Sequence, residues 1–277
     1  MRTVVHLGGR FVAPEEARVS LLDRGYLLGD GVFATMRGYR GRCFRVHRHL
    51  SDLARGAALF GMDLPAPAAI ADLADEAARR TDANDATVRV TLSRTETGST
   101  LSIVARPMDV PNDDVYRNGV AVVTVGPRRI PPACLDGSIK TTSYAVQVLA
   151  RREAEAKGAA EGIQLAIDGA LASGTMSNLF VVRGDSLYTP SLDGGCRAGV
   201  TRDAILELAR PFFAHVTEAR LEPSVLDDAD EVFLTSTRIE CLPIASVDGR
   251  PIGEPHNFPR TAALRAALAE LVRRETT

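Results

Sequence analysis

The sequence predicts an α+β protein of two domains, with mixed sheets and flanking helices. The chain has 277 residues, which is the length of one large or two medium domains. Its apolar residues alternate in short runs and recur at helical spacing in longer ones. Prolines and turn-forming polar residues gather between positions 106 and 118, which is typical of a linker. We therefore expect a small α+β domain over residues 1–110, a linker over 111–118 and a larger α/β domain over 119–277.

In the first domain, alternating apolar residues predict short strands and a few amphipathic helices. The expected strands are 4–7, 11–12, 32–36, 43–46, 87–92 and 101–105. Gly8-Gly9 is typical of a hairpin turn, and Asp23-Arg24-Gly25 predicts a second turn. Two helices are expected, over 47–60 and 65–80, and His49 lies on the apolar face of the first as a buried histidine.

In the second domain the apolar pattern predicts six further strands and three helices. The expected strands are 119–125, 163–167, 179–182, 186–189, 231–235 and 244–247. The expected helices are 144–157, 201–213 and 261–273. Thr201 is the expected N-cap of the second of these helices, because its hydroxyl can accept a hydrogen bond from the first turn.

Composition argues against several classes of function. The net charge is −2 and no basic stretch is interleaved with aromatic residues, which argues against nucleic acid and membrane partners. The four cysteines are widely separated and no cysteine or histidine pair has zinc spacing, so no metal site is expected. The N-terminal apolar run is too short for a signal peptide. We expect a reduced, cytoplasmic protein of bacterial type.

Lysine is rare in this chain, and that draws attention to one position. Of 33 basic residues only Lys140 and Lys157 are lysines. Lys157 ends a charged helical run and is expected on the surface. Lys140 stands between a Gly-Ser turn and an apolar helix, and lysine can form a Schiff base where arginine cannot. Lys140 is therefore either a covalent anchor or a lone lysine on a turn.

Three loops rich in small and hydroxyl residues accompany Lys140. They are 173–178, 199–201 and 235–237. Hydroxyl groups and backbone N–H groups at a helix start form a cup for anions, although each loop alone could be an ordinary cap or turn. A Schiff-base lysine with a phosphate cup is what pyridoxal phosphate requires. The GxGxxG and GxSxG patterns of nucleotide-binding proteins and α/β-hydrolases are absent.

An ordered series of motifs runs through nearly the whole chain. Its members are DRG at 23–25, GDGVF at 29–33, the segment 44–53, Ser93-Arg94, Lys140, DG at 168–169, SNLF at 177–180, YTP at 188–190, GVTR at 199–202, ADE at 229–231, TST at 235–237 and VDG at 247–249. In this series the chain resembles the class IV aminotransferases, the fold-type IV pyridoxal-phosphate enzymes. That family includes D-amino-acid aminotransferases, branched-chain aminotransferases and aminodeoxychorismate lyases.

The resemblance implies a homodimer with the active site between the two domains, acting on a small amino acid and a 2-oxo acid. Lys140 would form the Schiff base with pyridoxal 5'-phosphate and act as the catalytic acid and base. The implied cofactor-binding residues are Tyr144, Ser173, Ser177, Asn178, Val200, Thr201, Ser236, Thr237 and Arg55. The implied substrate-binding residues are Phe33, Arg37 and Arg94.

The chain departs from the family at three charged positions. Ala34 and Ser173 replace glutamates, and Asp52 replaces an arginine that binds the phosphate, so that Arg48 or Arg55 would have to compensate. The glutamate at the position of Ser173 normally keeps the pyridine nitrogen protonated, which a serine does not do. Three hypotheses follow: an aminotransferase with altered site chemistry, a lyase of the aminodeoxychorismate type, or a cofactor-free, non-catalytic homologue.

Overall fold

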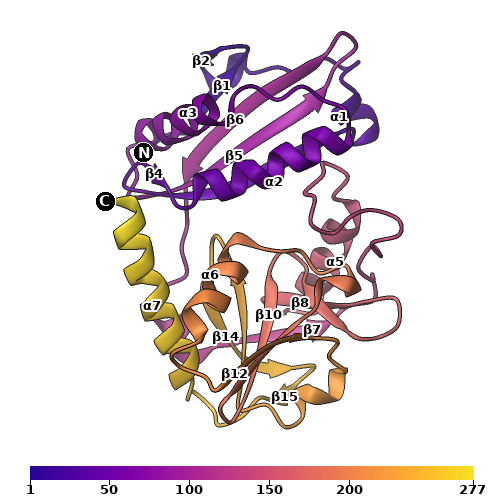
Figure 1. Ribbon diagram of the computed structural model, residues 1–277, viewed down its shortest axis with the longest axis vertical. Helices are drawn as coiled ribbons and strands as arrows, with labels where there is room; N and C mark the ends of the chain where they lie inside the picture. The colour runs from indigo at the N-terminus through magenta and orange to yellow at the C-terminus, as the bar shows by residue number, and fades with distance from the viewer. The chain divides into compact units, whose positions relative to one another are not determined.

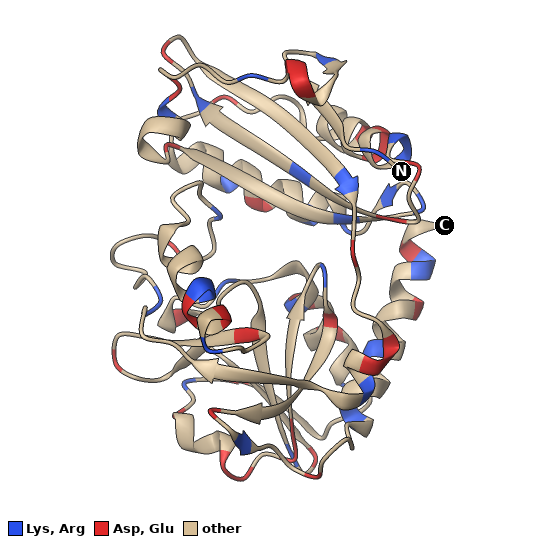
Figure 2. Ribbon diagram, turned by 180° about the vertical axis from the view of Figure 1, so that it is seen from behind, with Lys and Arg blue, Asp and Glu red and all other residues tan.

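The computed structural model describes all residues, 1–277, and the chain divides into two compact units (Figure 1). Unit 1 comprises Met1–Val110, Ile139–Tyr144 and Val272–Thr277, and unit 2 comprises Pro111–Ser138 and Ala145–Leu271. Acidic and basic residues are interspersed along the ribbon of both units (Figure 2). None of the helices combines the length and the apolar character needed to cross a membrane. Each unit has its own sheet and is described separately.

Unit 1 is organised around a six-stranded sheet in the order β2-β1-β6-β5-β3-β4. All neighbouring strands in it are antiparallel. The β1–β2 hairpin turns at Gly8 and Gly9, which both have positive φ, and this confirms the predicted hairpin. The strands are β1 Val4–Leu7, β2 Arg10–Val12, β3 Gly31–Tyr39, β4 Arg42–Cys43, β5 Asp85–Arg94 and β6 Ser99–Pro107.

Two amphipathic helices, α2 (Val46–Leu59) and α3 (Pro67–Arg80), lie against the sheet of unit 1 (Figure 1) and contribute buried residues to its core. Both confirm helices predicted from apolar spacing, with ends shifted by one or two residues. Their buried residues join alternate residues of β3 and β5 in one cluster, which includes Leu50, Leu53, Ala57, Ile70, Ala74, Val88 and Val90. Alternation places the remaining residues of these strands, such as Phe33 and Arg89, on the opposite face.

Unit 2 contains a mixed sheet in the order β12-β11-β10-β13-β14-β7-β8-β9, with β15 paired to β14. The pairs β11–β12, β14–β7 and β7–β8 are parallel, and the other pairs are antiparallel. The strands are β7 Val120–Thr124, β8 Glu161–Leu165, β9 Leu171–Gly174, β10 Asn178–Arg183, β11 Ser186–Pro190, β12 His215–Ala219, β13 Glu231–Ser236, β14 Glu240–Val247 and β15 Arg250–Pro251.

Four α-helices accompany this sheet along the chain. They are α4 Asp113–Asn118, α5 Ala145–Ala156, α6 Val200–Ala209 and α7 Pro259–Thr276. The last residues of α7, from Val272 onward, group with unit 1. Three short 3-10 turns complete the chain, at Pro14–Glu16, Leu192–Gly194 and Pro223–Leu226.

The structure differs from the sequence-based expectation where side chains cap short helices. Residues 111–118 are expected to be a linker, but α4 forms there because the Asn112 side chain accepts a hydrogen bond from the Val115 N–H at 3.0 Å. The expected turn at 23–25 is the start of helix α1 (Arg24–Leu28), which Asp23 caps in the same way through the Tyr26 N–H at 2.9 Å. Strands β9 and β12 were not predicted.

Candidate active site

Lys140 lies in a segment that is hydrogen-bonded to the beginning of β3. The Phe33 N–H donates to the Lys140 carbonyl at 2.8 Å, and the Thr142 N–H donates to the Gly31 carbonyl at 2.9 Å. Val32 and Thr141 form an antiparallel bridge between these contacts. Residues 139–144 therefore belong to unit 1, whereas sequence order places them in the second domain. More than a hundred residues separate the partners, so local sequence patterns carry no signal for this contact.

The side chain of Lys140 is half-buried beside two aromatic residues. Its Nζ donates a hydrogen bond to the Tyr144 hydroxyl at 3.3 Å and lies 5.0 Å from the centre of the Phe33 ring. Phe33 and Tyr144 meet edge to face, with 5.5 Å between their ring centres. The structure thus brings together three residues expected at the site. By contrast, Lys157 is an exposed surface lysine that pairs with Glu153 at 2.8 Å.

Arg89 completes this group, and sequence reasoning missed it. Its guanidinium carbon lies 3.5 Å from the centre of the Phe33 ring, on the face of the sheet away from the core. Its one side-chain hydrogen bond is donated to Thr91 at 3.2 Å, and no carboxylate lies within ion-pair distance. Burial lowers the pKa of the guanidinium, while the nearby Tyr144 raises it. Arg89 alternates with the buried Val88 and Val90 and lies two residues before Thr91, the strand partner of Phe33, and this alternation is the signal that could have revealed it.

The two arginines expected to bind substrate have other partners. Arg37 is buried and forms an ion pair with Asp85 at 2.7 Å, and its guanidinium lies over the ring of Tyr39. Arg94 donates hydrogen bonds to the carbonyls of Phe60 and Gly61 and pairs with Asp30 at 3.2 Å. The contacts of Arg94 join the end of β5 to the segments that follow α1 and α2. The substrate roles of Arg37 and Arg94 remain predictions.

Asp52 and Arg55, both on α2, contact each other. Asp52 is buried, and its Oδ1 accepts hydrogen bonds from Arg48 Nη1 at 2.5 Å and from Arg55 Nη2 at 2.8 Å. The sequence leaves open whether Asp52 would face a phosphate alone or be compensated by a neighbouring arginine. In the structure, both candidate arginines bind its carboxylate.

In unit 2 the beginning of α6 has the properties of an anion cup. The N-cap residue is Gly199, whose backbone is extended. It has no side chain that could accept a hydrogen bond from the first turn of the helix. This corrects the expectation that Thr201 is the N-cap, because Thr201 is the second residue of the helix. The first bond of the helix runs from the Asp203 N–H to the Gly199 carbonyl at 2.8 Å, so the N–H groups of Val200 and Thr201 precede it.

Asn178 fixes the loop that leads into this helix. Its amide donates to the Arg197 carbonyl at 2.7 Å, and a Cβ on Gly199 would collide with its Oδ1. Asn178 pairs across the strands with Thr235, whose hydroxyl is fully buried without a hydrogen-bond partner. Ser236 ends β13 and Thr237 follows it. The expected phosphate residues of unit 2 thus lie at neighbouring strand ends next to the helix start.

Ser173 and Ser177 occupy buried positions on and after β9. The Ser173 hydroxyl donates to the Gly174 carbonyl at 2.7 Å, and the Ser177 hydroxyl donates to Glu161 at 3.3 Å. Glu161, a further buried residue that sequence reasoning missed, also accepts hydrogen bonds from Thr175 and from the Gly162 N–H. Ser173 is neutral and already bonded to the backbone. It therefore offers no charge to a basic group placed near it.

Comparisons with known proteins identify the family. The family model for amino-transferase class IV matches residues 31–247. The chain is 30% identical to the D-alanine aminotransferase of Bacillus licheniformis, covering 98% of each protein, and 31% identical to the aminodeoxychorismate lyase of Bacillus subtilis, covering 88% of this chain and 87% of that protein.

A solved structure agrees with these sequence comparisons. A branched-chain amino acid aminotransferase from T.th., in a crystal structure with pyridoxamine 5'-phosphate, superposes with a TM-score of 0.91 at 28% identity, over 97% of this chain and 93% of that one. The resemblance and the fold-type IV class expected from the motifs are thereby confirmed. The chain belongs to the class IV aminotransferase family.

Proposed function

We propose that this chain is a pyridoxal-phosphate-dependent aminotransferase of a small amino acid, with Lys140 as the Schiff-base residue. The observation that supports it most is the setting of Lys140, half-buried beside Phe33 and hydrogen-bonded to the Tyr144 hydroxyl. The residues present fit the chemistry of the cofactor, because the chain has a half-buried amine beside two aromatic rings for the aldehyde and a helix start without a side-chain cap that suits an anion. When bound, the cofactor supplies an electron sink for the substrate.

The residues of this chain would bind, orient and move a proton. The Nζ of Lys140 would move the proton at the substrate Cα, and the Tyr144 hydroxyl would orient that amine. The N–H groups of Val200 and Thr201 would hold the phosphate, with Ser236 and Thr237 beside them. The Ser173 hydroxyl would leave the ring nitrogen neutral, because an alcohol does not hold a proton on a pyridine. We therefore expect transamination to be slow.

Arg89 is the residue that we propose for the substrate carboxylate. A partly desolvated guanidinium without an acidic partner favours an anion, and this one lies against Phe33 next to Tyr144 and Lys140. Replacement by glutamine should lower kcat/KM by about 10- to 100-fold, mainly through KM, because a charged hydrogen bond is lost. Steady-state kinetics test this, with Arg80→Gln on α3 as the control. An unchanged KM for Arg89→Gln would exclude the role.

The chain provides its own control for the Schiff base. Purified protein with added pyridoxal phosphate should develop the absorbance band of a pyridoxal Schiff base, and borohydride should fix the label on the peptide containing Lys140. Lys140→Ala should abolish both signals. Lys157→Ala, which removes the other lysine, should change neither. If Lys140→Ala retains the absorbance band, Lys140 does not form the Schiff base. If wild type forms no band, the result favours the hypothesis of a cofactor-free homologue.

A lyase is the second candidate, favoured by the 31% identity to the Bacillus subtilis aminodeoxychorismate lyase. Transamination and lyase chemistry give different products. Incubation with 4-amino-4-deoxychorismate should yield pyruvate and 4-aminobenzoate only if the lyase hypothesis holds. Incubation with small D- and L-amino acids and a 2-oxo acid should yield new amino acid if our proposal holds.

The proposal includes the cellular setting expected from the resemblance. We propose a homodimer in the cytoplasm that uses a 2-oxo acid as amino acceptor. The oligomeric state can be measured by light scattering during size-exclusion chromatography. A mass near 29.6 kDa, that of one chain, would reject the dimer.

A further inference from the structure

The carboxylate of Asp52 is the meeting point of two arginines on one helix. Its side chain is 4% exposed, whereas those of Arg48 and Arg55 are 39% and 51% exposed. Both guanidiniums donate to the same oxygen, Oδ1, from positions four residues before and three residues after it. The three residues, which we call the α2 cluster, therefore have a buried negative centre and two solvent-accessible positive ends.

Charge balance explains why the α2 cluster remains cationic. A buried carboxylate requires a charged partner, and here it has two. One guanidinium is neutralised, and the second leaves the cluster with a formal charge of +1. Two guanidiniums on one side of a helix repel each other unless an anion lies between them. Asp52 thus holds in place two arginines that would otherwise separate.

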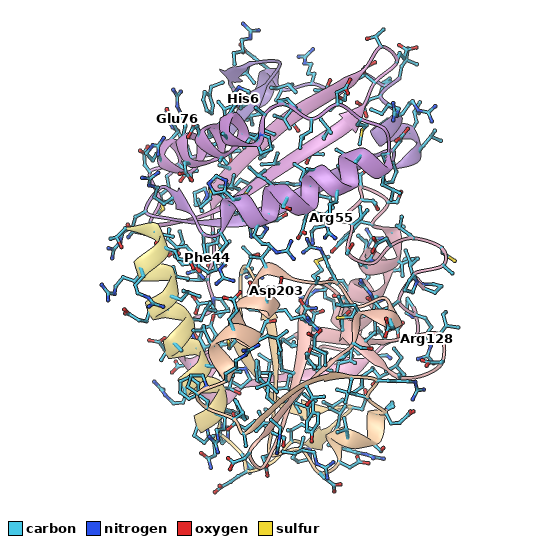
Figure 3. All side chains as sticks on the ribbon, viewed as in Figure 1. His6, Phe44, Arg55, Glu76, Arg128 and Asp203 are labelled. Carbon is cyan, nitrogen blue, oxygen red and sulfur yellow. The ribbon has the colours of Figure 1, made fainter.

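The α2 cluster lies on a part of the helix that packs against the lysine segment. Gly56 is one turn after Asp52 and follows Arg55 directly, and a Cβ on Gly56 would lie 3.0 Å from the side chains of both Ile139 and Val32. Ile139 immediately precedes Lys140. Figure 3 labels Arg55, which lies in the C-terminal half of α2. Unit 1 alone therefore places the cluster beside the chain segment that carries the proposed Schiff-base amine.

We propose that Asp52 is a positioning residue that holds Arg48 and Arg55 as a clamp for the phosphate monoester of the cofactor. The inference rests on the proposed function, because it takes the anion to be the phosphate of the aldehyde bound at Lys140. A guanidinium has five N–H donors, and the bond to Asp52 uses only part of those on Arg55. Its planar fork suits a phosphate, which carries close to two negative charges.

A simpler view of Asp52 predicts the opposite result. If Asp52 acts on the phosphate only by its own charge, it repels the dianion, and Asp52→Asn should tighten cofactor binding. If Asp52 acts through the arginines, Asp52→Asn should loosen them and weaken binding, although a negative charge is removed. The sign of the change in affinity therefore separates a positioning residue from a residue that is merely tolerated.

The experiment compares two aldehydes that differ by the phosphate. Full-length protein freed of cofactor is titrated with pyridoxal phosphate and with pyridoxal, and dissociation constants are taken from the Schiff-base absorbance. We expect Arg55→Gln and Asp52→Asn each to weaken pyridoxal phosphate by about tenfold, as for one lost charged hydrogen bond, and to leave pyridoxal unchanged. Since pyridoxal has no phosphate, its binding reports any general damage to the site.

Helix α3 offers a matched control in the same unit. Glu76 accepts hydrogen bonds from Arg79 at 3.0 Å and from Arg80 at 2.6 Å, but its side chain is 37% exposed. We call these three residues the α3 cluster, and Figure 3 labels Glu76 within it. Glu76→Gln and Arg80→Gln should change neither dissociation constant. This control removes the same charges at a place where no phosphate is expected.

Isothermal titration with inorganic phosphate separates this inference from the proposed function. If wild type forms no Schiff base but binds phosphate in an Arg55-dependent way, the proposed function fails, and the α2 cluster is a phosphate site without the cofactor. If pyridoxal phosphate binds equally well to wild type and Arg55→Gln, the clamp fails and the proposed function stands. Tighter binding of pyridoxal phosphate to Asp52→Asn also overturns the clamp.

Discussion

The α2 cluster and the α3 cluster contain the same charges on one helix each, yet their surroundings differ. Each has one carboxylate that accepts hydrogen bonds from two arginines of the same helix, at 2.5 and 2.8 Å in the first and at 2.6 and 3.0 Å in the second. The side chain of Asp52 is 4% exposed and that of Glu76 is 37% exposed. Both arginines of α2 bind one oxygen, Oδ1, whereas those of α3 bind one carboxylate oxygen each. Burial decides how strongly the carboxylate depends on its arginines.

The difference follows from the solvation of each carboxylate. Water can replace the arginines at Glu76, so an exposed ion pair of this kind adds little to stability. Asp52 has almost no access to water, so loss of its partners leaves a charge without compensation. The α2 cluster is thus constrained by folding, and its arginines are held in place. The α3 cluster is an ordinary charged surface.

The largest expected effect is on the free energy of unfolding. Arg48→Gln with Arg55→Gln removes both cations from buried Asp52 and should lower the free energy of unfolding by about 3 kcal/mol, the lower range for a broken buried ion pair. Arg79→Gln with Arg80→Gln should leave it unchanged within experimental error. Urea titrations at neutral pH measure both. Equal losses in the two double variants would show that burial does not distinguish the clusters.

Raising the salt concentration should separate the stability effects of the two clusters further. At about 1 M NaCl the Debye length is about 3 Å, so exposed pairs are screened while buried pairs are affected much less. The loss of unfolding free energy in the Arg48→Gln/Arg55→Gln double variant should therefore persist in high salt. A deficit that disappears at this salt concentration would place Asp52 in effective contact with water.

Local sequence patterns predicted most elements of the fold but not the position of the key lysine segment. Apolar spacing located α2 and α3 to within two residues, since each has one face in a core. Side-chain caps such as Asn112 were harder to recognise, because the same residues also form turns. The hydrogen bond between Phe33 and Lys140 joins distant parts of the chain, so only the folded structure reveals it.

The site residues also divide into those that the sequence predicted and those that only the folded structure reveals. The rarity of lysine and the ordered motifs singled out Lys140, and its aromatic neighbours Phe33 and Tyr144 were expected. Arg89 was missed because a strand pattern shows which residues share a face but not which arginine lacks an acidic partner. Arg94 shows the reverse, since an arginine in a family motif is occupied by the carbonyls at the end of α2. Arg94 pairs with Asp30, whereas Arg89 has no acidic partner, and this difference is not visible in the residue type.

The smallest expected effect concerns the titration of Glu76. Hydrogen bonds from Arg80 and then from Arg79 lower the pKa of this carboxyl below that of an ordinary glutamate, about 4.3. A lowered folded-state pKa means that the ion pair contributes stability above the ordinary pKa and loses it as pH falls through the folded-state pKa. Carbon-13 NMR of the side-chain carboxyl should therefore show a midpoint below about 4.3, which Arg80→Gln raises toward the ordinary value. Because Glu76 is exposed, the urea midpoint of Arg80→Gln should lie only slightly below that of wild type above the transition and should match it below the transition. A titration midpoint that Arg80→Gln does not move would mean that the ion pairs on α3 are too weakly formed in solution to serve as the reference for α2.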